Sequence, residues 1–330
     1  MHGIGNDYVY IDTWEQAEPS FGWPELSRRV ADRRFGIGGD GMILIEKPIS
    51  EGADGRMRMF NVDGSESEMC GNGLRCVSRY LHDRRFKGQD QLKLDTGAGC
   101  LTVNVVDRDA NGEAVGLRID MGLPVLAGAD IPCTGADAGT AGTITVDGMT
   151  LEYTAVSMGN PHCVIFVDDV KNFPVESVGP QIENNTDLFP RRVNIEFVQV
   201  ISRTEVHQRT WERGSGETLA CGTGASSVGV AGLLRGKTDS KVLVHLLGGD
   251  LNIEWAGAGS SVIMTGGASY ICDGTVDPSL LNKKSKLCPS DQLFLINLDG
   301  PFRHECHLRF HFESSTSSPQ FFGLSQSRGS

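Results

Sequence analysis

Two short stretches of this chain look alike: Met69-Cys70-Gly71-Asn72-Gly73 and Ala220-Cys221-Gly222-Thr223-Gly224. Each places one cysteine directly before a Gly-x-Gly turn, and the residues that follow each turn are compatible with a helix. The two cysteines are separated by about one domain length. Two thiols in matching surroundings therefore predict two halves of similar plan that face each other across one site.

The composition excludes several classes of partner. The chain has 330 residues, enough for about two domains, and a formal net charge of −12. That charge argues against a nucleic acid or an anionic membrane surface as partner. No apolar run approaches the ~20 residues that span a bilayer. Nine cysteines, an odd number in a long chain, indicate a reducing compartment. We expect the cytoplasm, or a plastid if a leader precedes the given sequence.

The pattern of apolar residues predicts a β-rich α+β fold. Helices are expected at residues 23–34, 76–85 and 225–234. The last of these is apolar nearly all round, which indicates a helix enclosed by a sheet. Alternating runs predict the strands at 42–46, 92–96, 101–106, 117–121, 163–167, 195–201, 241–246, 251–255 and 262–265. A Gly- and Ala-rich segment at 122–142 includes the expected connection between the two halves.

Two other patterns lead to no functional prediction. Residues 36–41 match G-x-G-x-x-G, but a helix precedes them and a strand follows, the reverse of a dinucleotide-binding motif. Residues 278–330 lack sustained periodicity, and we expect a disordered extension. Four potential metal ligands there lack a second pair at zinc spacing, so no metal is predicted: His304, Cys306, His307 and His311.

The chemistry follows from a cysteine at the start of a helix. Unpaired N–H groups and the helix dipole favour negative charge there, so we expect each thiol to have its pKa lowered toward thiolate. The same N–H groups hold a carboxylate, or the charge that develops when its α-carbon loses a proton. With two such helices facing each other, one thiolate removes the proton and the opposite thiol returns one to the other face. This is racemase or epimerase chemistry without a cofactor.

Two alternatives remain open at this point. Each cysteine could be a small buried apolar residue, as free cysteines often are. The two could also form a switchable disulfide in a redox or binding protein. The repeated glycines, and acidic residues upstream of each motif such as Glu68 and Glu217, favour the catalytic interpretation.

Seven segments in one order along the chain closely resemble the diaminopimelate epimerase family. They are residues 1–7 (MHGIGND), 33–40 (RRFGIGGD), 60–65 (FNVDGS), 69–76 (MCGNGLRC), 157–163 (SMGNPHC), 192–194 (RVN) and 211–224 (WERGSGETLACGTG). The resemblance covers roughly residues 1–277. Each motif alone is weak, but together they are highly specific.

The resemblance implies a role for each matching residue. Cys70 and Cys221 would be the acid/base pair, with His162 and Glu212 tuning them. His162 could instead be a structural histidine after the turn at Pro161. Four residues would line the helix starts around the reacting carboxylate: Gly71, Asn72, Gly222 and Thr223. The substrate's amino and carboxyl groups would be recognised by Asn6, Asn61, Asn160, Asn194, Glu212 and Arg213.

The resemblance also implies a fold and a substrate. Two pseudo-symmetric domains, each a curved, mostly antiparallel sheet wrapped around a central helix, would occupy residues 1–119 and 120–265, with 266–277 returning to the first. The substrate would be LL-2,6-diaminopimelate, converted to the meso form in lysine biosynthesis by a homodimer. A proline-type racemase is the nearest alternative. The chain departs from the family at Gly41, where relatives carry a glutamine, and at both ends.

Overall fold

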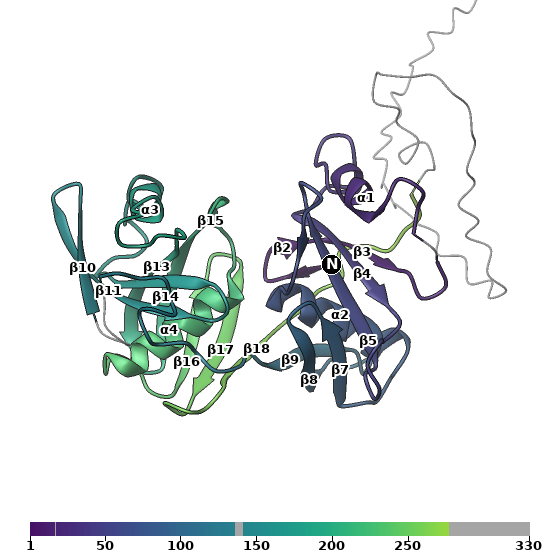
Figure 1. Cartoon of the computed structure of the whole chain (residues 1–330). Helices are drawn as coiled ribbons and strands as arrows, with labels where there is room; N and C mark the ends of the chain where they lie inside the picture. The colour runs from purple at the N-terminus through teal and green to yellow at the C-terminus, as the bar shows by residue number, and fades with distance from the viewer. Residues whose placement is uncertain (17, 136–140, 277–330) are drawn as a thin grey trace, which may run out of the picture.

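Two lobes lie side by side in the computed structural model, which describes residues 1–16, 18–135 and 141–276 (Figure 1). The N-terminal lobe contains β1 (His2–Gly3), β2 (Asn6–Asp7), β3 (Val9–Asp12), α1 (Trp23–Val30), β4 (Gly41–Glu46), β5 (Gly55–Asn61), β6 (Glu66–Ser67), α2 (Gly71–Arg84), β7 (Gln91–Thr96), β8 (Gly99–Arg108) and β9 (Ala114–Asp120). The C-terminal lobe contains β10 (Ala141–Val146), β11 (Met149–Ser157), β12 (Pro161–Phe166), α3 (Val175–Glu183), β13 (Asn194–Ser202), β14 (Glu205–Glu212), β15 (Gly216–Thr218), α4 (Gly222–Leu234), β16 (Lys241–Leu246) and β17 (Gly249–Trp255).

A single path of paired strands runs through both lobes. Its order is β10-β11-β12-β13-β14-β16-β17-β18-β9-β8-β7-β5-β4-β3. Strand β18 (Val262–Gly266) joins the lobes, because it pairs with β17 on one side and with β9 on the other. Most of the described pairs are antiparallel; the parallel ones are β12/β13, β14/β16, β3/β4 and β5/β7. The predicted α+β class is therefore confirmed.

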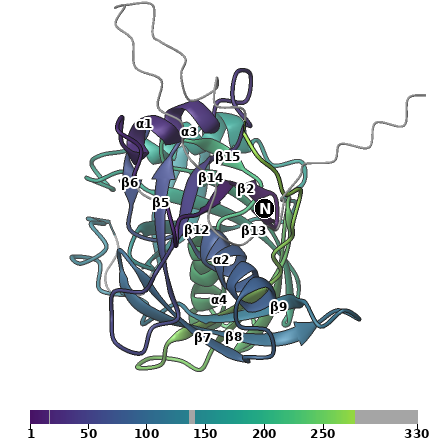
Figure 2. The ribbon, with the colours of Figure 1, turned by 90° about the vertical axis from the view of Figure 1, so that its right-hand side faces the viewer.

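Each lobe curves around one helix, as Figure 2 shows for α2 and α4 seen from the side. Helix α4 packs against strands of its own lobe and against β18, and its residues from Gly224 to Gly232 are buried. This confirms the prediction of an enclosed apolar helix. Helix α2 occupies the same place in the N-terminal lobe, against β9, β5 and β7.

The helix boundaries differ from the prediction where side chains compete with the backbone. Helix α1 ends at Val30 rather than at 34, because the Asp32 carboxylate accepts the N–H groups of Arg34 and Phe35 and forms a turn. Helix α2 starts at Gly71, five residues earlier than predicted. Helix α3 is not predicted by the sequence, because its proline at position 180 hides the helical pattern. Several strands are also not predicted, including β3, β5, β10, β11 and β14.

Met264 of β18 lies between the starts of the two enclosed helices. A Cβ added to Gly71 would lie 3.0 Å from its Cε, and one added to Gly222 would lie 3.2 Å from its Sδ. Both glycines therefore bring the helix backbones close to one thioether. Met264 belongs to a buried apolar cluster that contains residues of both lobes.

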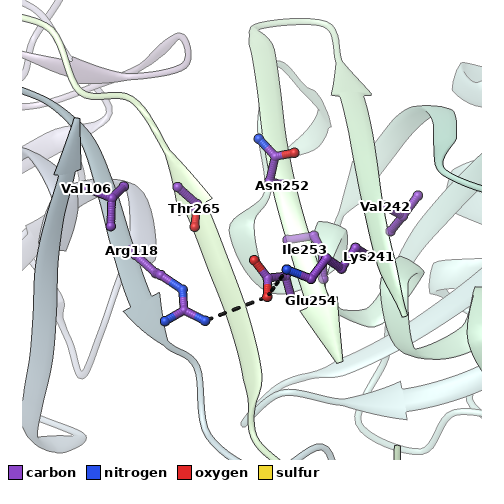
Figure 3. A pocket seen from close by; sticks show the side chains of 8 residues that line it. All are labelled: Val106, Arg118, Lys241, Val242, Asn252, Ile253, Glu254 and Thr265. Atoms are coloured by element: carbon purple, nitrogen blue, oxygen red, sulfur yellow. Dashed lines mark ion pairs between the residues drawn. The ribbon is translucent and has the colours of Figure 1, made fainter. Parts of the chain in front are cut away.

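The outer surface of the junction carries a separate pocket that contains none of the predicted site residues (Figure 3). There the Glu254 carboxylate of β17 pairs with Arg118 of β9 at 3.7 Å and with Lys241 of β16 at 3.1 Å. The pocket is lined by Val106, Arg118, Lys241, Val242, Asn252, Ile253, Glu254 and Thr265. The ion pair between Arg118 and Glu254 adds a surface link across β18.

Residues beyond β18 contact the N-terminal lobe. Ser269 pairs with His2, and Asp273 forms an ion pair with Arg84. The predicted domain boundaries stay a prediction, and the extension at 278–330, with its four potential metal ligands, lies outside the described residues. In the part of the chain that the structure covers, we find no helix with the length and apolar character of a membrane span.

Substituting Gly229 tests the close packing of α4. A Cβ at this position would lie 2.5 Å from Ile253 Cγ2 of β17, where the buried side chain has no room to move. We expect Gly229→Val to lower the free energy of unfolding by about 1–3 kcal/mol, measured by urea denaturation. The control is Ser227→Ala in the same helix, because its buried hydroxyl has no partner among the described residues. Equal midpoints for wild type and Gly229→Val would contradict the packing.

Candidate active site

Each cysteine is the N-cap of its enclosed helix, as the sequence predicted. Cys70 has φ −139° and ψ 116°, and Cys221 has φ −128° and ψ 108°. The Sγ atom of Cys70 accepts the N–H of Gly73 at 3.4 Å, and that of Cys221 accepts the N–H of Gly224 at 3.4 Å. The two caps therefore have nearly the same geometry, one in each lobe.

Asn72 connects the two helix starts. Its side-chain Nδ2 donates to Asn6 Oδ1 at 3.2 Å and to the backbone oxygen of Ala220, the residue before Cys221, at 3.5 Å. Asn6 Oδ1 also accepts from the Cys70 thiol at 3.6 Å. One amide thus links β2, the first turn of α2 and the residue that leads into α4.

A buried arginine holds this bridging amide in place. The Arg75 side chain is fully buried, and its Nη2 donates to Asn72 Oδ1 at 2.8 Å. Its Nε donates to the backbone oxygen of Gly267 at 2.9 Å. The guanidinium therefore fixes the orientation of Asn72 and brings a positive charge close to Cys70.

Burial controls the acidity of both thiols. It raises the pKa of Cys70, and the N–H groups of Gly73 and Asn72 and the charge of Arg75 offset only part of this effect. It raises the pKa of Cys221 well above its ordinary value, and the carboxylates of Glu212 and Glu196 add to it. The expectation that the helix start alone lowers each pKa is therefore wrong, because desolvation of the thiolate outweighs the helix N–H groups.

Three polar side chains from adjacent strands lie near Cys221. His162 of β12 and Glu196 of β13 are fully buried, and His162 Nδ1 lies 2.8 Å from Glu196 Oε1. Glu212 of β14 accepts from Thr218 Oγ1 at 2.5 Å, and burial raises its pKa. The Thr223 hydroxyl lies 3.5 Å from the Cys221 Sγ. The structure thus brings four of the predicted residues together, and adds Glu196.

The predicted asparagines differ in their distance from this centre. Asn160 Oδ1 lies 3.0 Å from His162 Nε2, so it joins the same cluster. Asn194 is buried, and its Oδ1 accepts the backbone N–H of Arg213 at 2.9 Å. Asn61 donates to Ser65 Oγ at 2.9 Å, within its own turn, and no described contact joins it to the cysteines.

Gly41 lies at the start of β4, where the family resemblance leads us to expect a glutamine. A Cβ at this position would lie 2.1 Å from the backbone oxygen of Phe60 on the neighbouring strand. A side chain at position 41 would therefore require the backbone to move.

One group of described side chains has the composition of a metal site. Single ligand atoms of His162, Glu196 and Cys221 lie within 4.8 Å of one another. However, the 2.8 Å between His162 Nδ1 and Glu196 Oε1 is a hydrogen-bond length. Two ligands of one zinc ion lie about 3.3 Å apart, given bonds of about 2.0 Å. A metal would have to replace that hydrogen bond; the absence of a metal stays a prediction.

Two buried charged residues of the site are not predicted by the sequence patterns. Arg75 lies within the segment 69–76, yet that segment indicates no role for it. Glu196 lies between Ile195 and Phe197, so strand alternation places it on the opposite face of β13, and only the tertiary structure shows that both faces are buried here. Tyr8, buried near Cys70, was also overlooked, and burial raises its pKa.

Comparisons with known proteins place the chain in a family. The sequence model of the family described as "Diaminopimelate epimerase" matches residues 1–127 and 154–271. A protein of that name from Desulfitobacterium hafniense is 48% identical over 279 residues, which cover 84% of this chain and 96% of that protein. Another from Methanococcus maripaludis is 43% identical over 280 residues, covering 84% of this chain and 98% of that protein.

Solved structures share the fold at low sequence identity. A phenazine biosynthesis protein of the PhzF family from Bacillus anthracis has a TM-score of 0.56 and 17% identity, with 81% of this chain and 92% of that chain covered. A hydroxyproline epimerase from Agrobacterium vitis has a TM-score of 0.51 and 15% identity, with 81% and 86% covered. The family match and the close relatives together show that this chain is an enzyme that belongs to the diaminopimelate epimerase family.

Proposed function

We propose that the protein interconverts LL-2,6-diaminopimelate and meso-2,6-diaminopimelate by proton transfer between Cys70 and Cys221. The names of the relatives suggest the substrate. The observation that carries the proposal is the matched pair of N-capping cysteines, each accepting the N–H three residues further on at 3.4 Å. Asn72 links the two helix starts, so the two thiols can exchange protons with opposite faces of one α-carbon bound between them.

The reaction needs one thiolate and one thiol at a time. The thiolate takes the α-proton, and the electrons of the broken C–H bond remain on the α-carbon and spread into its carboxylate. The opposite thiol then gives its proton to the other face, which inverts the stereocentre. The enzyme is left with its proton on the first sulfur, so the reverse reaction exchanges the roles of the two cysteines.

The helix starts supply the electrostatic stabilisation. N–H groups of the first turns of α2 and α4 point toward a carboxylate bound between the cysteines, and their partial positive charge stabilises the additional charge of the carbanion. Gly71 and Gly222 carry no side chain, so the Met264 side chain packs closely against both helix starts. Because the chain's own backbone takes the charge, the proposal includes no cofactor.

The substrate itself offsets the desolvation of the thiols. Burial raises the pKa of both cysteines in the free protein. The α-ammonium group of a bound amino acid places a positive charge beside the sulfurs, which favours the thiolate. We therefore expect the substrate to complete the electrostatics of its own site.

The far end of the substrate carries a second ammonium and a second carboxylate. Arg213 provides the cation for that carboxylate, and its backbone is held by Asn194. Asn6, Asn61 and Asn160 provide amides for the remaining polar groups. A proline-type substrate lacks this second end, so the presence of Arg213 and several asparagines favours the longer substrate. A homodimer and the two predicted domains complete the proposal.

Replacing either catalytic cysteine tests the two-thiol mechanism. We expect Cys70→Ser and Cys221→Ser each to lower the rate of epimerisation about a thousandfold or more, because a hydroxyl is a far weaker base. The measurement is proton NMR of LL-diaminopimelate in D₂O, which follows loss of the α-proton and appearance of the meso isomer. The control is Cys100→Ser on the exposed face of β8, which should retain full activity. Near-normal turnover in both active-site variants would refute the mechanism.

Replacing Arg213 tests recognition of the far carboxylate. We expect Arg213→Met to raise KM for diaminopimelate about tenfold or more, with a smaller change in kcat, since the lost interaction lies away from the reacting carbon. Arg203→Met is the matched control, because that arginine lies in the turn between β13 and β14 and pairs with Asp239. An unchanged KM would remove Arg213 from the site. Exchange of proline but not of diaminopimelate by the wild type would favour the proline-type alternative.

A further inference from the structure

Glu196 is a buried carboxylate with an unusual set of neighbours. It lies on β13 and is fully buried, with Oε1 2.8 Å from His162 Nδ1 on the adjacent strand β12. Its other oxygen, Oε2, is also buried and has no hydrogen-bond partner among the described residues. A buried carboxylate with one unsatisfied oxygen is costly to the fold, which points to a function.

The same carboxylate lies against the first turn of α4. A Cβ on Gly224 would lie only 2.6 Å from Glu196 Oε1, so the glycine makes room for it. Gly224 is the residue whose N–H donates to the Cys221 Sγ. Single polar atoms of Glu196, His162 and Cys221 lie within 4.8 Å of one another. Glu196 therefore lies next to both Cys221 and Gly224, which lie at the start of α4.

The charges around the two thiols differ. Cys221 faces carboxylates from two strands, Glu196 on β13 and Glu212 on β14, together with His162 on β12. Cys70 shares the influence of Glu212 but has the buried Arg75 guanidinium near it. A thiolate is therefore less favourable at Cys221 than at Cys70, although the two caps have the same backbone geometry.

We propose that Glu196 is a positioning residue that makes Cys221 hold its proton more tightly than Cys70 does, so that Cys70 is the first of the two thiols to become the base. The inference rests on the proposed function. Glu196 acts in two ways, by its negative charge beside Cys221 and by its hydrogen bond to His162. The His162 ring has an oxygen at each nitrogen, Glu196 at one and Asn160 at the other, so its orientation over the site is set.

This preference gives the two directions of the reaction different starting states. Substrate whose α-proton faces Cys70 meets the thiol that loses its proton more readily. Substrate whose α-proton faces Cys221 depends on the less favourable of the two thiolates. Removing the charge of Glu196 should make the two protonation states more nearly equal.

Alkylation by iodoacetamide measures the preference directly, because only the thiolate reacts. The full chain is treated over a range of pH, and peptide mass spectrometry gives a separate rate for each cysteine. In Glu196→Gln we expect the rate at Cys221 relative to that at Cys70 to increase about tenfold near pH 7. The midpoint of the Cys221 pH profile should move down by about one unit, with the Cys70 profile unchanged.

Matched variants separate charge from packing. Glu196→Asp keeps the charge and should retain a ratio near that of wild type. Glu183→Gln removes a different buried carboxylate of the same lobe, one that binds Trp211 and Arg192, and should leave the ratio unchanged. If Glu196→Gln does not fold, Gly224→Ala provides the test. The added methyl group displaces the Glu196 carboxylate, so the alkylation rate of Cys221 relative to Cys70 should also increase.

The outcomes distinguish this inference from the proposed function. An active enzyme whose alkylation ratio is the same in wild type, Glu196→Gln and Gly224→Ala would overturn the role of Glu196 alone. An equal change in Glu183→Gln would assign the effect to general loosening of the lobe and would overturn it too. Failure of folded wild-type protein with free thiols to exchange the α-proton of diaminopimelate would instead overturn the proposed function.

Discussion

The structure depends on bringing two helix starts together in a buried place. Each start carries unpaired N–H groups and partial positive charge, so two of them facing each other need acceptors and negative groups between them. The cysteine caps satisfy one N–H in each helix, and the Asn72 amide links the two. A bound carboxylate is the natural completion of this arrangement. In the proposed function, the substrate carboxylate is bound by the N–H groups that the fold itself leaves unsatisfied.

The sheet and its central strand hold this arrangement. Strand β18 pairs with both lobes, and its Met264 contacts the start of each enclosed helix. Arg75 ties the first turn of α2 to the backbone at Gly267, just beyond that strand. A change in the angle between the lobes would therefore move the two thiols relative to each other. The position of the two cysteines therefore depends on the packing of β18 at the junction between the lobes.

The two cysteines have nearly the same backbone conformation, but the pKa of each thiol differs because different side chains surround it. Desolvation disfavours the thiolate at both caps and outweighs the helix N–H groups. The difference between the caps then comes from Arg75 near one and from Glu196 and Glu212 near the other. A reversible two-base reaction tolerates such a difference, since each cysteine needs to be a base in only one direction.

Local patterns in the sequence determined the two helix caps and the positions of several strands. The repeated Cys-Gly-x-Gly motif predicted both helix caps, and alternating apolar residues located strands such as β16, because caps and strand faces depend on near neighbours in the chain. Tertiary structure alone decided that Asn72 reaches Ala220 and that Glu196 lies beneath Gly224. It also reversed the expected direction of the thiol pKa shifts. Burial is a property of residues distant in sequence, and its cost to a charge exceeds the contribution of one helix start.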